Sequence, residues 1–203
     1  MPRDKTLSHK KVLQAAKEEF MRAGFEKASI RNIGAAAGLT SAALYRHCTD
    51  KEDLFCQVVE PAITALQEWE DAHISGAYRS VNEGDYQGIT SQSEIDMIRT
   101  VALPHQDLFR LLVSGSAGTR YENFIHDLVK EQEEKMKEGL RFLKDKGYPV
   151  KEVDPEELHI LNSAYTTALF EPVIHGFDPE NVDHYLNTIE RFFMPGWHEI
   201  LGI

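Results

Sequence analysis

One short stretch near the N-terminus gathers side chains that can hydrogen-bond to phosphates and to the edges of nucleic-acid bases. Arg46 and Lys51 carry positive charge there, and Ser41, Tyr45 and His47 add hydroxyl and imidazole groups. An arginine can hold guanine with two hydrogen bonds, whereas a lysine binds phosphate as a compact charge. A nonspecific phosphate contact is an equally good interpretation of Arg46. These residue types together indicate a surface for a polyanion.

Charge is distributed unevenly along the 203 residues. Residues 1–51 hold 10 Lys and Arg against 5 Asp and Glu, a formal charge of +5, while the rest of the chain carries −16 and the whole chain −11. Each cation that approaches a phosphate releases condensed counterions, so a basic segment on an acidic body favours DNA contact confined to that segment. A solvated helix surface that is basic by chance is the alternative interpretation.

The composition predicts a folded globular protein, with 42% hydrophobic and 27% charged residues. No apolar run is long enough for a membrane helix, and residues 1–10 lack the apolar core of a signal peptide. Cys48 and Cys56 do not form the paired motifs of zinc modules or of a disulfide framework. We therefore expect a cytoplasmic protein.

Sequence motifs of catalysis are missing from the chain. Its nine histidines are scattered, and the sequence contains neither HExxH nor GxSxG nor a phosphate-binding loop. We expect no enzymatic activity, no catalytic residue, no cofactor and no metal. A helical protein that binds a metal or a small molecule through residues assembled by folding is a weaker alternative.

Apolar residues recur at helical spacing along the chain, and no alternating strand pattern occurs. Ser8, Asp154 and Asp178 are expected to cap helices, Pro61 to kink or split one, and Pro195-Gly196 to end the last. Residues 75–92 form the least regular part. Start and stop signals predict helices over residues 8–24, 29–37, 41–46, 50 onward, 95–102, 105–113, 121–146, 155–175 and 179–194. The expected fold class is all-α.

Residues 29–46 have the arrangement of a helix-turn-helix, two short helices joined by a tight turn at Gly38. The second helix is too short to be stable alone, so its Leu44 must be anchored in the core. A helix held in this way can enter the major groove of DNA. The side chains then left facing outward are Ser41, Ala42, Tyr45, Arg46 and His47.

A family resemblance is carried by ordered motifs within residues 9–59. They are Ala15-Ala16 and Phe20 with Gly24-Phe25, Ser29-Ile30-Arg31-Asn32-Ile33, Ala37-Gly38-Leu39, Leu44-Tyr45-Arg46-His47, and Lys51-Glu52-Asp53-Leu54. In this order and spacing they resemble the DNA-binding domain of the TetR (tetracycline-repressor) family of bacterial transcription regulators. The resemblance covers 51 of 203 residues. It implies an N-terminal three-helix DNA-binding domain, residues 1–52, and a larger helical effector-binding and dimerisation domain, residues 53–203.

The resemblance also implies which residues touch DNA. Phosphate contacts are implied for Ser29, Arg31 and Lys51. Contacts of the recognition helix toward bases are implied for Thr40, Ser41 and Ala42. Contacts with phosphates or groove edges are implied for Tyr45 and His47, although Tyr45 also has the alternative of a core aromatic.

Two residues depart from the family pattern. Cys48 stands where the family usually has phenylalanine, and we interpret it as a small core residue, with a redox sensor as the alternative. Gly34 replaces the more usual alanine, which should lower the stability of its helix by up to ~1 kcal/mol.

The mechanism implies a homodimer, because one short recognition helix reads few base pairs and two related by a twofold axis read a palindrome. In the family the last two long helices usually pair across that axis. Outward-facing Tyr185, Ile189, Phe192 and Phe193 are the candidates for the seam, and burial within one subunit is their alternative.

A pocket for a small-molecule effector is expected among the central helices. Its candidate residues, each of which can also be plain core, are His105, Phe109, Phe124, Asn162, Tyr165 and Thr166. The resulting hypothesis is a ligand-responsive regulator, by default a repressor, that binds a palindromic operator in double-stranded DNA and is released by the effector through the helix that contains Pro61. A regulator of the same family without ligand control is the alternative.

Overall fold

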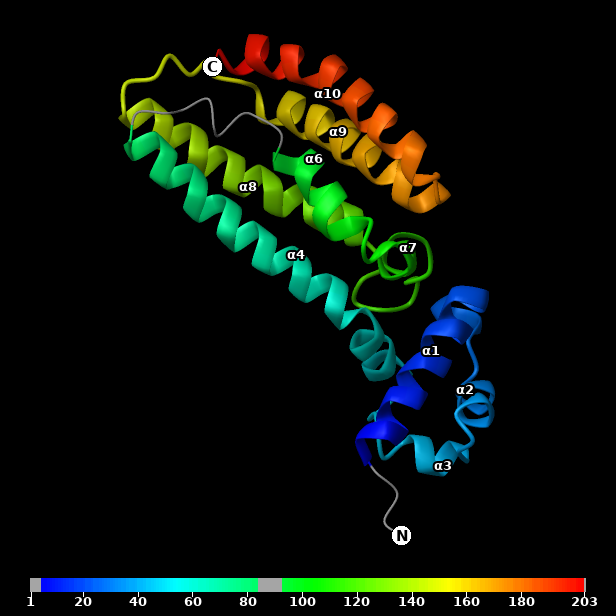
Figure 1. Ribbon diagram of the computed structural model, residues 1–203. Helices are drawn as coiled ribbons and strands as arrows, with labels where there is room; N and C mark the ends of the chain where they lie inside the picture. The colour runs from blue at the N-terminus through cyan, green and yellow to red at the C-terminus, as the bar shows by residue number, and fades with distance from the viewer. Residues whose placement is uncertain (1–4, 84–92, 203) are drawn as a thin grey trace. The chain divides into compact units, whose positions relative to one another are not determined.

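The computed structural model describes residues 5–83 and 93–202, and every regular element in these ranges is a helix (Figure 1). The all-α prediction is therefore confirmed. The elements in chain order are α1 (Lys5–Lys27), α2 (Ile30–Ala36), α3 (Ser41–Leu44), α4 (Lys51–Asn82), α6 (Ser93–Met97), a π-helix η1 (Ile98–Ala102), α7 (Gln106–Ser114), α8 (Phe124–Asp145), α9 (Pro155–His175) and α10 (Pro179–Leu201). The part of the irregular stretch predicted at 75–92 that follows residue 83 lies outside the described residues.

Contacts between residues divide the chain into two compact units. The first unit contains the chain up to Thr64 together with His105–Asn123, and the second contains Ala65–Pro104 and the chain from Phe124 onward. Helix α4 contributes to both. The predicted boundary between residues 52 and 53 divides a DNA-binding domain from an effector-binding domain, whereas these two units are defined by contacts alone. The contacts do not test that boundary, and it stays a prediction.

The first unit is built around an aromatic cluster. Phe20 and Phe25 of α1 and Phe55 of α4 are buried, and the centroids of their rings lie 5.1–6.1 Å apart. Gly24 has φ of +70°, which interrupts α1 as predicted and turns Phe25 back into the cluster. This core fixes α1 against the start of α4.

Two predictions of where helices begin in the first unit have different outcomes. The prediction that Ser8 caps α1 is wrong, because α1 already begins at Lys5 and the Ser8 hydroxyl lies 3.3 Å from Nε2 of His47. The start predicted at residue 50 is confirmed, because α4 begins at Lys51 with a capping box: Asp50 accepts from the backbone N–H of Asp53, and Asp53 accepts from that of Thr49.

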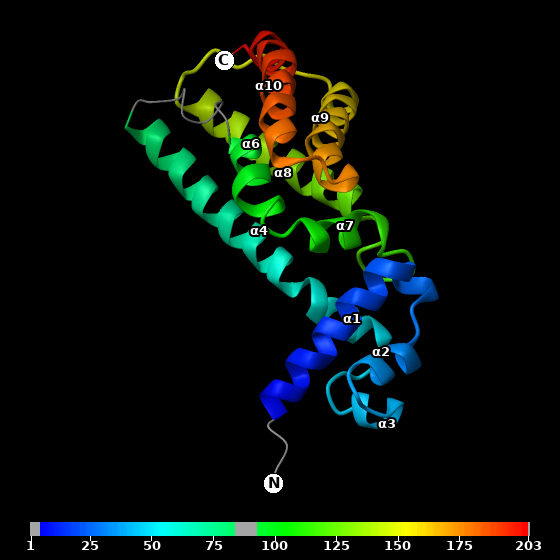
Figure 2. The same cartoon turned by 45° about the vertical axis from the view of Figure 1, so that its right-hand side comes forward.

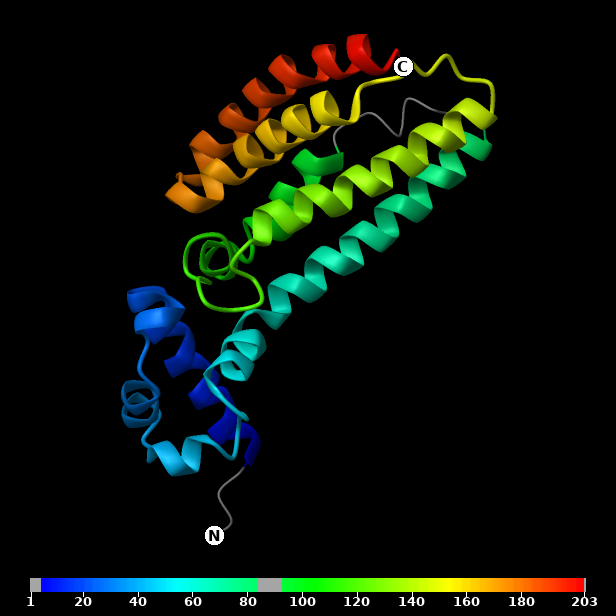
Figure 3. The same ribbon diagram turned by 180° about the vertical axis from the view of Figure 1, so that it is seen from behind.

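The second unit packs long helices side by side. Figures 1 and 3 show α8 running along the second part of α4, where Lys135 pairs with Glu70 at 2.9 Å and the ring of Phe142 meets that of Tyr78. Figure 2 shows α10 lying beside α9. Arg99 of η1 binds Asp183 of α10 at 2.9 Å.

Three helix predictions meet different outcomes in the structure. Asp154 caps α9, accepting from the N–H groups of Glu156 and Glu157, as predicted. Asp178 is the N-cap residue of α10, which begins at Pro179 as predicted, but its side chain makes no capping hydrogen bond. The stop predicted at Pro195-Gly196 is wrong, because α10 continues to Leu201 with Pro195 exposed inside it.

Helix α4 likewise continues through Pro61, so the predicted split does not occur. None of the helices in the described ranges is long and apolar enough to cross a membrane.

Candidate nucleic-acid interface and ligand cavity

Capping residues fix both helices of the predicted helix-turn-helix. The Ser29 hydroxyl accepts from the N–H of Asn32 at the start of α2, and the Thr40 hydroxyl accepts from the N–H of Ala43 at the start of α3. Between them Gly38 has φ of +69°, the left-handed conformation that the predicted tight turn requires. The predicted helix-turn-helix is therefore present.

Gly34 allows the close packing of this turn. Its carbonyl accepts from the N–H of Leu39 at 2.8 Å, and a Cβ atom added to Gly34 would lie 3.1 Å from the carbonyl oxygen of Leu39. Alanine at this position would press on backbone that cannot rotate away. The departure from the family pattern thus has a steric reason in this chain.

Helix α3 presents the predicted side chains outward. Leu44 is fully buried beneath it. Ser41, Ala42 and Arg46 are exposed, and Tyr45 is 51% exposed, which excludes the core interpretation of this tyrosine. A hydroxyl, a phenol and a guanidinium therefore share the surface around this short helix, and the exposed guanidinium of Arg31 lies at the start of α2.

His47 differs from the prediction of an outward-facing residue. It is half-buried, its ring stacks on that of His9 with centroids 5.6 Å apart, and its Nε2 lies 3.3 Å from the Ser8 hydroxyl. The side chain thus packs the end of α3 against α1.

Lys51 is the first residue of α4, and its ammonium binds protein groups. Its ammonium donates to the carbonyl oxygens of Phe25, Glu26 and Ala28 at 2.8, 3.1 and 3.4 Å, and it sits 4.3 Å from the centroid of the Phe25 ring. A lysine has three N–H donors, so these carbonyls at the end of α1 engage all of them. In this structure the ammonium therefore joins α4 to α1, and its phosphate contact stays a prediction.

Glu19 is a positioning residue that sequence reasoning missed. Its nearly buried carboxylate accepts from the side chains of Arg22 and Asn32 and from the N–H of Ser29. The Arg22 hydrogen bond and these further donors lower the pKa of Glu19 below its ordinary value. The one sequence feature that could have indicated this role is an acidic residue within a basic segment, ten residues before the helix cap Ser29.

Cys48 is buried beneath this surface, as interpreted from the sequence. Its Sγ lies 3.9 Å from the carbonyl oxygen of Leu44, and burial raises the pKa of its thiol. A buried thiol with a raised pKa forms little of the reactive thiolate.

The second unit contains a cavity of about 290 Å³ between its helices. Aromatic side chains make much of its wall, and polar groups from α4, α6, α8, α9 and α10 complete it. The residues that carry its chemistry are Trp69, Glu70, His73, Tyr78, Glu94, Gln132, Lys135, Glu138, Phe142, Asn162, Tyr165, Trp197 and His198. An apolar cavity with a few polar groups suits a small organic molecule.

Two of the six predicted pocket residues, Asn162 and Tyr165, line this cavity. Phe109 is fully buried in the first unit, and His105 precedes its helix α7. Phe124 packs edge-on against Phe170 in the second unit's core. The predicted pocket thus combined core residues of both units with two true lining residues, because periodicity cannot tell a buried position from a cavity wall.

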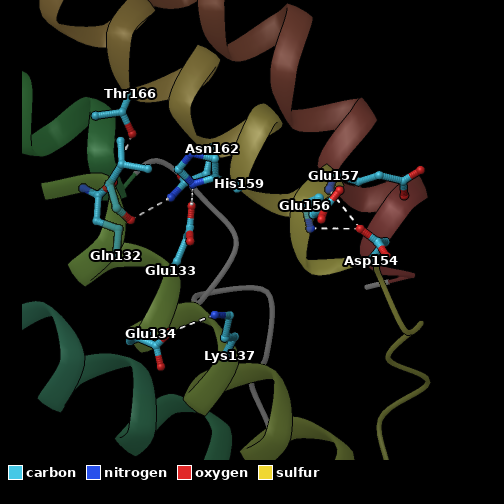
Figure 4. Close-up of polar contacts among 11 residues, drawn as sticks. Gln132, Glu133, Glu134, Lys137, Asp154, Glu156, Glu157, His159, Asn162 and Thr166 are labelled. Carbon is cyan, nitrogen blue, oxygen red and sulfur yellow. Dashed lines mark hydrogen bonds and ion pairs between the residues drawn. The ribbon is translucent and has the colours of Figure 1, made fainter. Parts of the chain in front are cut away.

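Polar contacts join α8 and α9 beside the cavity (Figure 4). Thr166, also predicted for the pocket, donates to Gln132 at 3.1 Å. His159 lies 2.6 Å from the nearly buried Glu133, and Asn162 donates to the carbonyl of Val129 at 3.4 Å. Across residues 5–83 and 93–202, no three His, Cys, Asp or Glu side chains are placed to hold a metal ion.

The predicted dimer seam is only partly outward-facing. Ile189 is buried, the Tyr185 hydroxyl donates to the carbonyl of Ala168, and Phe193 packs on Tyr165. The expected exposure of Ile189 is wrong, and Tyr185 and Phe193 are half-buried, since their side chains help to hold α10 against its neighbours. Phe192, in contrast, is 76% exposed.

Comparison with known proteins agrees with this architecture. A family model described as bacterial regulatory proteins, tetR family, matches residues 12–58. No curated protein matches the sequence.

Three solved structures share the fold. NalD of Pseudomonas aeruginosa, the secondary repressor of the MexAB-OprM multidrug efflux pump, is 17% identical, with 93% of this chain and 97% of NalD covered and a TM-score of 0.53. MexZ of the same organism, a repressor responsible for antibiotic resistance, is 16% identical, with 96% and 94% covered and a TM-score of 0.57. SmeT, solved with triclosan, is 23% identical, with 91% and 90% covered and a TM-score of 0.55.

The matched family model covers the same residues that form the helix-turn-helix, its caps and its aromatic core. Residues 12–58 therefore form an N-terminal domain of the kind found in the tetR family of bacterial regulatory proteins, which agrees with the resemblance predicted from the sequence.

Proposed function

We propose that the protein is a repressor that binds a palindromic operator as a homodimer and releases it when a small molecule enters the cavity of the second unit. The observation that carries the DNA-binding part is helix α3, whose Leu44 is buried while Ser41, Tyr45 and Arg46 face outward. Such a helix presents donors to base edges in the major groove.

Phosphate contacts are supported by groups around α3. Arg31 is exposed at the start of α2, and it forms no ion pair with the described residues. The Glu19 carboxylate is engaged with Arg22 and Asn32, which leaves the charge of Arg31 available to a phosphate. We keep Ser29, Arg31, Thr40, Ser41, Ala42, Tyr45 and Arg46 as the proposed DNA contacts.

Homodimerisation is supported by apolar and small residues exposed on the last two helices. Ile160 of α9 is 66% exposed, and Ala164 and Thr167 follow it at helical spacing. Phe192 of α10 is 76% exposed, and Pro195 follows it. Large exposed apolar side chains of this kind mark protein contact sites.

Effector control is supported by the cavity and by α4. This helix contributes Trp69 and His73 to the cavity wall, and its first residue, Lys51, binds the end of α1. A ligand that favours a conformation of α4 unsuited to DNA shifts the population away from the bound state. The repressors NalD and MexZ and the triclosan-bound SmeT have the same fold, which favours repression and small-molecule control here.

The protein would act in the cytoplasm, where the chromosome of a bacterium lies. The same regulator without ligand control is a second candidate, and the cavity is the observation against it.

The deciding experiment is selection of DNA from a random pool by the purified protein, followed by fluorescence anisotropy on the selected sequence. We expect a palindromic site, and an affinity that falls steeply with salt because phosphate contacts release counterions. Recovery of no common sequence, or an affinity independent of salt, would contradict the proposal.

A further inference from the structure

The cavity lining holds more acids than bases. Among the residues that the structure describes, Glu70, Glu94 and Glu138 line it together with one lysine, Lys135, and no aspartate or arginine. The Lys135 ammonium lies 2.9 Å from Glu70 and 2.8 Å from Glu131, so its charge is compensated within the protein. With neutral histidines, the described part of the lining carries a formal charge of −2.

Aromatic faces form the other part of the wall. Trp69 stacks on His73 with ring centroids 4.9 Å apart and planes 4° apart, and Tyr165 packs edge-on against Trp197 at 6.4 Å. The faces of tryptophan and tyrosine rings attract cations through their quadrupoles, most strongly where water is excluded. The wall thus combines negative charge with surfaces that favour a positive partner.

Tyr165 and Glu94 bring these two properties together. Tyr165 of α9 is nearly buried, and its hydroxyl forms no hydrogen bond with another residue in the described ranges. Burial, and then the negative charges of Glu94 and Glu190, raise the pKa of this phenol. Glu94 and Tyr165 line the same cavity, so the Glu94 carboxylate would repel an anion bound at the aromatic wall and attract a cation there.

We infer that the effector of this protein is a lipophilic organic cation, an aromatic amine or quaternary ammonium, held by the faces of Trp69, Tyr165 and Trp197 and by the carboxylate of Glu94. This inference rests on the proposed function in one respect, that the cavity is the effector site. The volume of about 290 Å³ lies at the lower end of small-molecule sites, which limits the ligand to a compact molecule.

The chain supplies its own probe for the test. It contains two tryptophans, Trp69 and Trp197, and both line the cavity. Intrinsic fluorescence of the purified full chain is titrated with benzyltrimethylammonium, with its uncharged isostere neopentylbenzene, and with the anion 4-tert-butylbenzoate. We expect saturable quenching by the cation, at least about tenfold tighter than by the neutral isostere, and the weakest response from the anion.

Two substitutions that change the charge of the cavity lining in opposite directions test the inference further. Glu94→Gln should weaken binding of the cation about tenfold, and Lys135→Gln should strengthen it, while both leave the neutral isostere unchanged. Glu134→Gln is the matched control, because Glu134 lies on α8 beside Lys135 but pairs with Lys137 outside the cavity. Thermal melts of each variant identify any loss of folding, and the ratio of cation to neutral affinity corrects for it.

The outcomes separate this inference from the proposed function. Tighter binding of the neutral or anionic probe overturns the cation class and leaves an effector cavity in place, as does a Glu94→Gln variant with unchanged cation affinity. Failure of all three probes to alter the fluorescence also overturns the inference. Binding of the cation without any loss of operator affinity supports the ligand class and contradicts effector control.

Discussion

The ammonium of Lys51 lies 2.8 Å from the carbonyl oxygen of Phe25 and 4.3 Å above the ring of the same residue. One side chain at the start of α4 therefore caps the end of α1 and packs on the aromatic core of the DNA-binding domain. The carbonyls at a helix C-terminus carry partial negative charge, which favours this cation.

Replacing Lys51 by methionine should destabilise the protein by about 1–3 kcal/mol, because three hydrogen bonds to a charged group and a cation–π contact are lost. Urea unfolding measures the change, and Lys27→Met, an exposed lysine in the last turn of α1, is the control. A Lys51→Met variant that is fully stable but binds DNA weakly would support the phosphate contact predicted from the sequence.

Arg46 and Arg31 should contribute to DNA binding in different ways. Arg46→Ala should relax the preference at one base position, at a cost of about 1–3 kcal/mol for the preferred base. Arg31→Ala should weaken all sequences alike and reduce the slope of log affinity against log salt by about 1. Anisotropy titrations on the selected operator and its single-base variants distinguish the two, and equal losses on every sequence for Arg46→Ala would assign it to phosphate.

Gly34→Ala should destabilise the protein although alanine is the better helix former. The added methyl group meets the carbonyl oxygen of Leu39 at 3.1 Å, and relief of this contact should cost about 1–3 kcal/mol. Gly76→Ala in α4 is the matched control, because nothing lies within 4 Å of its added Cβ, and it should stabilise by about 0.5–1 kcal/mol. Equal stabilisation of both variants in urea unfolding would remove the steric explanation.

Phe192→Asp should dissociate the proposed dimer and leave each subunit folded, since this ring is exposed in the single chain. Sedimentation should show a shift from dimer to monomer, with helical circular dichroism unchanged. Arg191→Asp tests a neighbouring exposed position that points to another side of α10. A wild-type protein that sediments as a monomer at micromolar concentration would contradict the homodimer itself.

Low pH should destabilise the DNA-binding domain because it protonates Glu19. Its pKa is lowered in the folded protein, first by the hydrogen bond from Arg22, so its contribution is complete above the ordinary carboxyl pKa and is lost as pH falls through the folded value. The free energy of unfolding should therefore decrease from about pH 5 downward. Glu19→Gln should flatten this dependence, whereas Glu18→Gln, which replaces an acid bonded to exposed Gln14, should leave it unchanged.

Local signals in the sequence predicted much of this protein. The Asp154 cap, the turn at Gly38 and the burial of Leu44 follow from residue type and spacing, which act over one or two helical turns. The exposed side of α3 followed from the position of that one leucine. These features needed no knowledge of the rest of the fold.

Residues that depend on distant partners were predicted less well. Lys51 binds carbonyls 23–26 positions earlier in the chain, and His47 meets Ser8, 39 positions away. Ile189 has the spacing of a surface stripe but is buried, because helix packing decides which side of an amphipathic helix is covered. Such choices are made in three dimensions, and residue periodicity alone does not contain them.

The proposed base contacts lie within residues 29–46, the lining of the cavity lies within residues 69–201, and α4 is the element of the cavity wall that also packs in the DNA-binding domain. Under the proposed function, evolution can therefore change the effector specificity without changing the DNA sequence that is bound, and the reverse. Chimeras joined within this one helix should inherit promoter choice from one parent and chemical responsiveness from the other.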